Sequence, residues 1–413
     1  MFRKLLTFEE AKKIIRERCR PTPSGIEEIS LLEASDRVLA QDVTANRDIP
    51  PFDRSTVDGY AVRAQDTFGA EENRPITLAA HGAVHVGETP KIVVRKKEAA
   101  EIVTGAPIPK GADAVVMVEQ TERKVDRLRV FSAVARHENI MKAGQDIRKG
   151  EIVLRSGKLL GSREVGVLAA LGMVKIKVYI VPRVAVFSTG AEVTEPGRSL
   201  PDGKIYDINA YSLSAAVLES GGKPIFLGVF PDEIKKLQKA LRHALASADL
   251  VVTSGGVSVG PKDVMPKALA SLGKPGTIIS GIAIKPGKPT TIGLIRDKLV
   301  FSLPGHPTSA LLAFHLFARP IIQAMGGRTA EEDLEMKAIT MARMFPAKGK
   351  RTFVMVALKR DKLSRTTVEP ILAGDSGAIT TLARADGYVE IPENVQFVDA
   401  GEEVAVRLFR KMP

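Results

Sequence analysis

The chain has 413 residues, of which 44% are hydrophobic and 26% charged, and this ordinary globular composition excludes a disordered chain. The 60 Lys and Arg residues exceed the 48 Asp and Glu residues, and the resulting charge of +12 suits a phosphate-bearing ligand or a nucleic acid without identifying either. Cys19 is the only cysteine, so the sequence excludes an intrachain disulfide and a zinc site built on clustered thiolates.

The sequence contains no segment that is typical of a secretory signal or a membrane span. Residues 1–18 carry several acids and lack an apolar stretch of signal-peptide length. No run of about 18 apolar residues occurs elsewhere in the chain. We therefore expect a soluble, cytoplasmic protein without a membrane partner.

An N-terminal helix and a β-rich segment are predicted for the first third of the chain. Residues 7–10 (TFEE) have the form of a capping box, and apolar residues recur at helical spacing as far as Ile15. This helix should end near Cys19, before Pro21. From 25 to 150, short apolar runs are separated by Gly, Pro and Asn, which is typical of a mostly β domain with irregular loops.

Strand-like and helix-like segments alternate between about 183 and 330, and this pattern predicts βα units around a mainly parallel sheet. In such a sheet, ligands bind beyond the carboxyl ends of the strands. The remainder, from 331, consists of strand-like segments with turn signals between them, which predicts a small β domain or barrel. The expected α/β strands are 183–188, 224–230, 249–253, 277–284, 290–295 and 299–302, and the expected helices are 209–219, 232–248, 264–272 and 308–325.

Three loops rich in glycine or proline follow predicted strands of this sheet, at residues 253–260 (TSGGVSVG), 285–289 (KPGKP) and 303–310 (LPGHPTSA). Glycines let backbone N–H groups approach an anion, lysines add charge, and hydroxyl groups at a helix N-terminus add donors. Each loop alone has an ordinary alternative, namely a tight turn, a solvated turn and a helix cap. Their common position favours a phosphorylated or otherwise anionic small ligand, and no nucleophile–base pair of hydrolase type accompanies them.

Several carboxylates accompany these loops, and carboxylates near a phosphate site typically bind Mg²⁺. Glu192 follows the first α/β strand, Asp232 begins a predicted helix, and Asp263 follows the glycine loop. Asp232 and Asp263 have the alternative role of favourable charges at helix N-termini. Asp58 and Asp146 lie in the β-rich segment, so only a neighbouring domain or subunit could bring them to the sheet.

Seven longer motifs follow one another along nearly the whole chain. They are 51–63 (PFDRSTVDGYAVR), 103–119 (VTGAPIPKGADAVVMVE), 143–150 (AGQDIRKG), 187–193 (FSTGAEV), 254–263 (SGGVSVGPKD), 284–289 (IKPGKP) and 303–310 (LPGHPTSA). In this order they resemble the motifs of the molybdopterin molybdenumtransferases, the MoeA family, which is similar to the E domain of gephyrin.

The resemblance implies an elongated, multidomain subunit of the α/β plus β class. Residues 1–24 and 151–182 are expected to form an elongated linking domain, and residues 25–150 an inserted, irregular β domain. Residues 183–330 should form a molybdopterin-binding-like α/β domain, and residues 331–413 a C-terminal domain like a β-barrel. The family resemblance also implies a homodimer whose active cleft lies between the α/β domain of one subunit and the inserted domain of the other.

The resemblance further implies a Mg²⁺-dependent transferase that inserts molybdate, or its isostere tungstate, into adenylylated molybdopterin and releases AMP. An upstream molybdopterin adenylyltransferase would supply the substrate. The implied catalytic residues are Asp58, Thr104, Asp146, Glu192 and Asp263, and the implied magnesium ligands are Asp58, Glu192, Asp232 and Asp263. The implied cofactor-binding residues are Ser254, Gly255, Gly256, Ser258, Lys285, Lys288, Pro304, Pro307, Ser309 and Arg351.

Two other functions account for part of the sequence. A non-catalytic molybdopterin-binding or scaffold protein of the same fold would explain the loops, but it would have no use for the acids of the implied catalytic set. A nucleic-acid binder would explain the positive charge. Against it, the basic residues are spread along the chain, aromatic residues are only 5%, and there is no Trp to stack on bases. We therefore favour the transferase.

Overall fold

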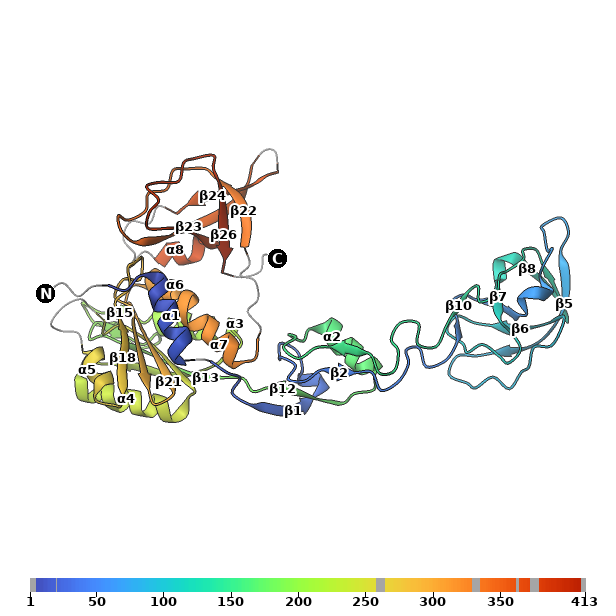
Figure 1. The fold of residues 1–413 in the computed structure, drawn as a ribbon, viewed down its shortest axis with the longest axis horizontal. Coiled ribbons are helices and arrows are strands. Elements are labelled where there is room, and N and C mark those ends of the chain that lie inside the picture. Colours follow the sequence, from blue (N-terminus) through green and yellow to red (C-terminus); the bar gives the residue numbers. More distant parts are fainter. Residues whose placement is uncertain are drawn as a thin grey trace.

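The subunit is elongated and carries different domains at its two ends (Figure 1). The computed structural model describes residues 5–19, 21–257, 264–328, 335–361, 364–371 and 379–409. The α/β domain and the C-terminal β domain lie together at one end, the inserted β domain lies at the other, and a narrow linking region joins them. The predicted fold class is thus confirmed.

A six-stranded sheet forms the centre of the α/β domain, in the order β16-β13-β17-β21-β20-β18. The strands are β13 (Arg183–Thr189), β16 (Lys223–Phe230), β17 (Leu250–Ser254), β18 (Pro275–Ser280), β20 (Thr291–Ile295) and β21 (Lys298–Leu303). The first four in spatial order run parallel, whereas β20 and β18 complete the sheet in antiparallel pairings. Every residue of β17 is buried, as expected for a central strand that is covered on both faces.

Helices cover both faces of this sheet and bury a separate apolar core on each. Val186 and Leu213 belong to one core, and Phe187 and Leu241 belong to the other. Successive side chains of β13 point to opposite faces, which is why Val186 and Phe187 enter different cores. No helix in the described ranges is long and apolar enough to span a membrane. The helices are α3 (Asn209–Glu219), α4 (Ile234–Ser247), α5 (Met265–Ala270), α6 (Pro307–Ala313) and α7 (Arg319–Met325).

Two elements of this domain differ from their predicted extent. The helix expected at 308–325 is divided, because a π-helical segment, Phe314–Ala318, separates α6 from α7, and Pro320 lacks the N–H that a regular helix would use there. The strand expected at 277–284 ends at β18. Gly281 then takes a φ of +81°, and the chain turns away to form β19 (Ile284–Lys285).

A second six-stranded sheet forms the inserted domain, in the order β7-β4-β6-β5-β9-β8. Gly59 permits the close approach of two strands, because a Cβ atom there would lie 1.9 Å from the carbonyl oxygen of Val116. Side chains of this sheet contribute to two apolar cores. The strands are β4 (Gly59–Val62), β5 (Ile76–Val84), β6 (Glu98–Ile102), β7 (Ala114–Met117), β8 (Thr121–Lys124) and β9 (Arg127–Val130), with β3 (Arg54–Ser55) paired to β10 (Ile140–Met141) beside them.

The linking region contains more of the chain than the predicted boundaries assign to it. Strands β1 and β12 pair antiparallel, as do β2 and β11, so that residues 26–44, expected in the inserted domain, belong to this region. Leu39, Leu168 and Val178 share its core, which explains why the two distant segments come together. Its elements are β1 (Ile26–Ser30), β2 (Val43–Thr44), β11 (Ile152–Leu154), α2 (Ser162–Ala170) and β12 (Lys175–Tyr179).

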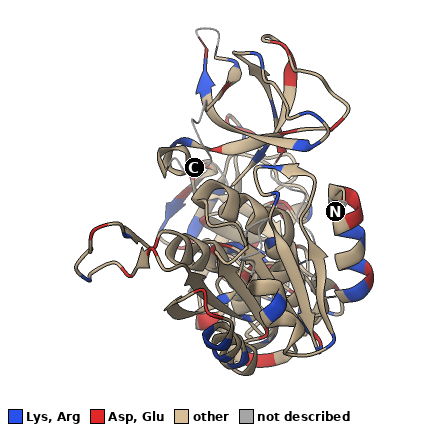
Figure 2. Ribbon diagram, turned by 90° about the vertical axis from the view of Figure 1, so that its left-hand side faces the viewer, with Lys and Arg blue, Asp and Glu red and all other residues tan. Residues whose placement is uncertain are grey.

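The N-terminal helix α1 (Phe8–Cys19) lies on the α/β domain and not in the linking domain that the sequence predicts for residues 1–24 (Figure 1). Its apolar stripe explains this position, because the ring of Phe8 lies 5.7 Å from that of Phe317 and 5.5 Å from that of Phe353. The first turn of α1 is acidic and the last is basic, an arrangement that complements the helix dipole (Figure 2).

Five strands of the C-terminal domain close into a barrel, in the order β23-β24-β22-β26-β25, with β25 pairing back to β23. Strand β19 of the α/β domain adds to this sheet, where Ile284 pairs with Arg351 and Lys285 with Thr352. The lysine loop is thereby joined to the C-terminal domain. The elements are β22 (Glu335–Thr340), β23 (Arg351–Arg360), β24 (Thr366–Pro370), α8 (Ile379–Arg384), β25 (Gly387–Ile391) and β26 (Glu403–Leu408).

Candidate functional site

Three parallel strands of the α/β domain end side by side, and the loops that follow them form the centre of the candidate site. Ser188 of β13 lies opposite Ser254 of β17, which in turn lies opposite Leu303 of β21. The glycine loop after β17 and the proline-containing loop after β21 are therefore neighbours. Their adjacency follows from the parallel register, because parallel strands place their carboxyl ends at the same edge of a sheet.

The glycine loop requires its glycines for the turn itself. Gly255 has a φ of +91°, and a Cβ atom there would lie 2.1 Å from the carbonyl oxygen of Thr189. The N–H of Gly255 already donates to the oxygen of Leu303 at 3.1 Å, whereas that of Gly256 has no acceptor among the described residues. Asp232 lies beside this loop and accepts a hydrogen bond from the hydroxyl of Thr189. The described part of the loop thus places the available N–H of Gly256 next to a carboxylate.

A buried polar network holds the two loops together from below. The Nδ2 atom of Asn209 donates to the Ser254 hydroxyl at 2.8 Å and to the Gly305 oxygen at 2.7 Å. The Ser254 hydroxyl donates to the oxygen of Pro304 at 2.9 Å. Ser254, predicted to bind the ligand, is only 1% exposed and therefore stabilises the loops instead of facing solvent.

Two residues of this network, Asp207 and Asn209, are absent from the sequence-based prediction. Asp207 accepts hydrogen bonds from the Ser188 hydroxyl at 2.8 Å and the Ala210 N–H at 3.1 Å, which caps helix α3. The available signal is an Asp-x-Asn sequence whose Asn is the first residue of the predicted helix. Such a sequence ordinarily indicates only a helix cap, so the contact with two other loops could not be read from it.

Helix α6 begins directly after the loop that follows β21. Pro307 and Ser309 occupy its first turn and are both buried, as is Thr308 between them. The Thr308 hydroxyl has no partner among the described residues. The Thr308 hydroxyl is therefore available to a ligand or to a water molecule that is itself buried at the start of this helix.

The lysine loop after β19 leaves both of its charges available. Lys285 is exposed, Lys288 is half-buried, and neither has an ion-pair partner among the described residues. The Thr290 hydroxyl donates to the Gly287 oxygen at 2.7 Å and closes the turn. A Cβ atom on Gly287 would lie 3.9 Å from that of Ala313, so the loop packs against α6. Two unpaired ammonium groups on a fixed turn are suited to phosphoryl oxygens.

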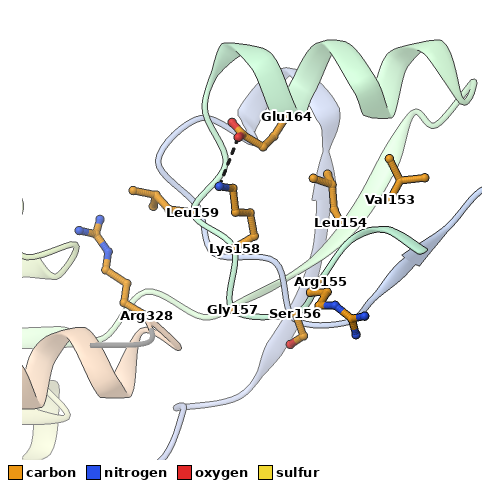
Figure 3. Close-up of a pocket in the computed structure, with 9 residues that line it drawn as sticks. All are labelled: Val153, Leu154, Arg155, Ser156, Gly157, Lys158, Leu159, Glu164 and Arg328. Atoms are coloured by element: carbon orange, nitrogen blue, oxygen red, sulfur yellow. Dashed lines mark ion pairs between the residues drawn. The ribbon is translucent and has the colours of Figure 1, made fainter. Parts of the chain in front are cut away.

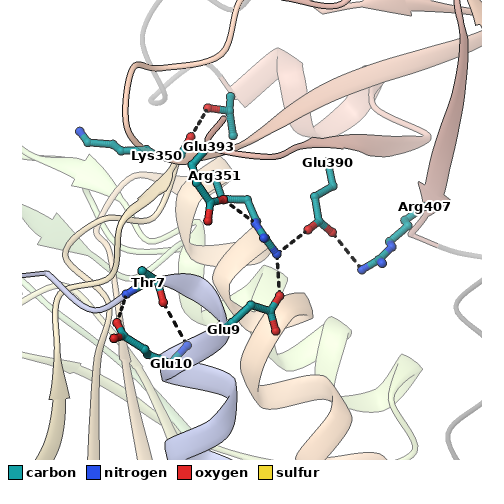
Figure 4. A network of polar contacts seen from close by, with 9 residues as sticks. Thr7, Glu9, Glu10, Lys350, Arg351, Glu390, Glu393 and Arg407 are labelled. Carbon is teal, nitrogen blue, oxygen red and sulfur yellow. Dashed lines mark hydrogen bonds and ion pairs between the residues drawn. The ribbon is translucent and has the colours of Figure 1, made fainter. Parts of the chain in front are cut away.

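Arg351 has partners other than the oxyanion that the family resemblance implies for it (Figure 4). Its guanidinium group donates to Glu9 at 2.6 Å, to Glu390 at 3.0 Å and to Glu393 at 3.1 Å. It also lies over the ring of Phe8, 5.2 Å from its centroid. These contacts join α1 to the C-terminal barrel, and they engage the Nε and Nη1 donors of the guanidinium group with carboxylates.

A second group of candidate residues lies on the inserted domain. Thr104 donates its backbone N–H and its hydroxyl to Oδ1 of Asp58, at 2.7 and 2.9 Å. The backbone hydrogen bond, with a further contribution from the hydroxyl, lowers the pKa of Asp58, so this exposed carboxylate stays ionised. Asp146 is also exposed. Because the inserted domain and the α/β domain lie at opposite ends of the elongated subunit, these residues do not reach the glycine loop of their own subunit (Figure 1).

The predicted magnesium ligands are not assembled by the described residues of one chain. Asp58 lies on the inserted domain, Glu192 is exposed in the loop after β13, and Asp232 lies at the glycine loop. Ser258 and Asp263 fall outside the described residues. Within the described ranges, no three His, Cys, Asp or Glu side chains are grouped so that they could hold a metal ion.

A cavity of about 610 Å³ lies away from these loops, between the linking region and the end of α7 (Figure 3). Lys158 and Glu164 line it and form an ion pair at 3.6 Å, and Arg328 faces them from the α/β domain. None of the residues predicted for the site lines this cavity.

Models of known families match three consecutive parts of the chain. Residues 6–172 match the MoeA N-terminal region (domain I and II), residues 185–324 match a "Probable molybdopterin binding domain", and residues 337–409 match the MoeA C-terminal region (domain IV).

Relatives of similar length cover nearly the whole chain. Molybdopterin molybdenumtransferase 2 of Mycobacterium tuberculosis is 33% identical over 97% of this chain and 98% of its own length. The molybdopterin molybdenumtransferase of Bacillus subtilis is 32% identical over 96% of this chain and 93% of its own. Two crystal structures of molybdopterin biosynthesis MoeA proteins from Pyrococcus horikoshii superpose with TM-scores of 0.86 and 0.85, at 41% and 34% identity. They cover 99% and 98% of this chain and 100% of their own. The chain therefore belongs to the MoeA family of molybdopterin molybdenumtransferases.

Proposed function

We propose that the protein is a molybdopterin molybdenumtransferase that acts in molybdenum cofactor biosynthesis. The observation that carries this proposal is the convergence of the glycine loop and the Pro304–Gly305 loop at adjoining strand ends, in a chain of the MoeA family. Lys285 and Lys288, which have no ion-pair partner in the described part of the chain, support an anionic ligand.

The proposed substrates are adenylylated molybdopterin and molybdate, with tungstate as the alternative oxyanion. Hydrolysis of the phosphoanhydride by water would release AMP and leave molybdopterin with its phosphate monoester. Molybdate would lose one oxygen as water, with the two thiol protons, as the dithiolene sulfurs bind molybdenum. Lys285, Lys288 and the N–H of Gly256 would bind phosphoryl oxygens, where charge develops during the cleavage. The dithiolene itself ligates molybdenum, so the protein need not supply Cys or His.

Mg²⁺ is the proposed cofactor. The ligands proposed for it are Asp58, Glu192, Asp232 and Asp263. The described carboxylates suit a hard cation, because the hydrogen bonds of Thr104 keep Asp58 ionised and Asp232 lies beside Gly256. When bound, Mg²⁺ would neutralise negative charge on the phosphoryl oxygens.

A homodimer is proposed because the two groups of site residues lie at opposite ends of one subunit. Asp58, Thr104 and Asp146 of one subunit would then complete the α/β site of the other. An exposed aromatic pair on the α/β domain supports an apolar contact with a second subunit. Tyr211 on α3 is 47% exposed, Phe226 on the edge strand β16 is 43% exposed, and their ring centroids lie 5.1 Å apart. The substrate would come from an upstream molybdopterin adenylyltransferase in the cytoplasm.

The experiment that tests this function measures AMP release from adenylylated molybdopterin in the presence of Mg²⁺, with molybdate, with tungstate and with no oxyanion. Release that depends on the oxyanion is expected, and the two oxyanion series rank the metals. Tight binding of the substrate without AMP release in any series contradicts the transferase and identifies a cofactor-binding scaffold.

A further inference from the structure

Asn209 lies beneath the candidate site, at the first residue of α3, and connects the loops that follow two neighbouring strands. Only 8% of its surface is exposed. Its amide contacts Ser254, the last residue of β17, and Gly305, in the loop after β21. Ser254 contacts Pro304 in turn. One side chain from a helix thus bridges the loops that follow two neighbouring strands.

The partners of Asn209 fix the orientation of its amide group and restrict the residue type. The Gly305 oxygen can only accept a hydrogen bond, and the hydroxyl hydrogen of Ser254 is already given to Pro304, so both partners need a donor. The NH₂ group supplies two donors in one plane. Aspartate has the same shape but, when ionised, no donor, and alanine reaches neither partner.

The other end of the amide faces no partner in the described part of the chain. Oδ1 of Asn209 is buried without a hydrogen bond, and the same holds for Oδ2 of Asp207 and for the Thr308 hydroxyl, which lie in the adjoining segments. A buried polar atom without a partner costs free energy. Because Oδ1 of Asn209 and Oδ2 of Asp207 can only accept hydrogen bonds, these atoms indicate bound water or another donor beside α3.

We propose that Asn209 is a positioning residue of this site, which fixes the distance between the glycine loop, where phosphoryl oxygens would bind, and the Pro304–Gly305 loop, where the oxyanion would bind. Asn209 itself touches no reacting atom. The identity of the oxyanion, molybdate, rests on the proposed function, whereas the effect on loop spacing does not.

Steady-state kinetics of AMP release at varied molybdate concentration test the first part, with Asn209→Ala and Asn209→Asp compared with the wild type. We expect the KM for molybdate to rise about tenfold or more, as for the loss of one or two buried hydrogen bonds, while kcat changes much less. Ser214→Ala is the matched control, because this hydroxyl of the same helix donates only to Ala210, at 2.6 Å. An unchanged KM in both folded Asn209 variants overturns the proposal.

A double variant shows whether Asn209 acts through Ser254. Because the two side chains belong to one network, the effects of Asn209→Ala and Ser254→Ala on the KM for molybdate should not add. Fully additive effects contradict a shared positioning role.

Hydrogen exchange separates the positioning role from the proposed function. The N–H of Gly255 donates to Leu303 between the two loops, so Asn209→Ala should accelerate its exchange, whereas Ser214→Ala should not. If the wild type releases no AMP, the proposed function is wrong, and the exchange comparison still decides the positioning role. Equal exchange at Gly255 in all three proteins contradicts that role whatever the activity.

Discussion

Thr104 gives both of its donors to one oxygen of Asp58, and no basic side chain of the described chain forms an ion pair with this carboxylate. The second oxygen remains available on an exposed surface. A carboxylate that is held ionised without a cationic neighbour is suited to bind a cation or to face a positively charged site. The pair therefore has the properties expected of the half-site that the proposed homodimer assigns to the inserted domain.

We predict that Asp58 titrates below the usual range of an aspartate and that Thr104→Ala raises its pKa part of the way back, since the backbone N–H, the larger cause, remains. The folded-state pKa is depressed. The hydrogen bonds therefore stabilise the fold above the unfolded pKa, and this contribution is lost as the pH falls through the folded pKa. Carboxyl-carbon NMR titration measures the shift, and Thr104→Ser, which keeps both donors, is the control. An equal pKa of Asp58 in the wild type and Thr104→Ala contradicts the assignment.

Mixing two inactive variants tests the shared site. Asp58→Ala damages the inserted domain and Asp232→Ala damages the α/β domain, so a mixed dimer contains one site with both defects and one intact site. When the subunits reassort at random, about half of the dimers are mixed, and one of the two sites in each mixed dimer is intact. The mixture should therefore show about one quarter of the wild-type AMP release. Asp58→Ala mixed with Asp146→Ala is the control, because the proposal assigns both residues to the same half of the cleft and every mixed site carries a defect. Recovery in both mixtures, or in neither, rules out a cleft between subunits.

Replacement of Arg351 should lower the free energy of unfolding and leave the KM for molybdate nearly unchanged. Its side chain is 15% exposed, and Arg351→Met leaves Glu390, which is 19% exposed, with less neutralising charge. We expect the free energy of unfolding to fall by about 2 kcal/mol, below the range for a fully buried pair because Glu9 is 62% exposed. Arg343→Met, which breaks an exposed pair with Asp399, should cost less than about 0.5 kcal/mol. A raised KM for molybdate at unchanged stability would instead support direct contact between Arg351 and the oxyanion.

The glycine loop provides a test of steric fit. Gly255→Ala adds a Cβ atom 2.1 Å from the Thr189 oxygen at a φ of +91°, so strands β13 and β17 must separate. We expect a loss of about 3 kcal/mol in the free energy of unfolding and loss of AMP release. Gly197→Ala is the control, because its φ is +89° but no atom lies within 4 Å of the new Cβ, and it should cost about 1 kcal/mol. Equal unfolding energies for the two variants would show that backbone conformation alone governs the loop.

Local rules of the sequence predicted the features that depend on neighbouring residues. The capping box at the start of α1 is formed as predicted, with the Thr7 N–H donating to Glu10 at 2.7 Å and the Glu10 N–H donating to the Thr7 hydroxyl at 3.2 Å. The strand that precedes the glycine loop is continuously apolar, and it is the buried central strand β17. Both features need only a few consecutive residues to be recognised.

Features that depend on distant parts of the chain could not be predicted in this way. The spacing of α1 shows an apolar stripe but not the surface that it covers, so its position on Phe317 and Phe353 was missed. The family resemblance implies a ligand-binding role for Arg351, but its carboxylate partners come from a helix more than 300 residues away and from another strand. Asn209 looks like a helix start, and its role appears only when the ends of β17 and β21 are placed beside it.

The acid sensitivity of the fold should depend on His315, which lies in the π-helical segment between α6 and α7. Its ring packs 4.9 Å from that of Phe409, at the junction with the C-terminal domain. Burial, together with the charge of Arg319, lowers the pKa of His315 to about 3. In the unfolded chain this histidine takes up a proton near its ordinary pKa of 6.5, whereas in the folded chain it does not. The free energy of unfolding therefore falls as the pH falls from 6.5 toward 3. Other groups also titrate in this window, so the informative quantity is the difference between variants.

We expect His315 to contribute about 2 kcal/mol to the loss of unfolding free energy between pH 7 and pH 5, and His315→Phe should remove this contribution. Urea unfolding at several pH values measures it. His243→Gln, which changes an exposed histidine of α4, should retain the slope of the wild type. A slope that is equal in the wild type and in His315→Phe would show that His315 is protonated in the folded state as readily as in the unfolded chain. In that case, burial of His315 between the two domains would not disfavour its protonated, charged form.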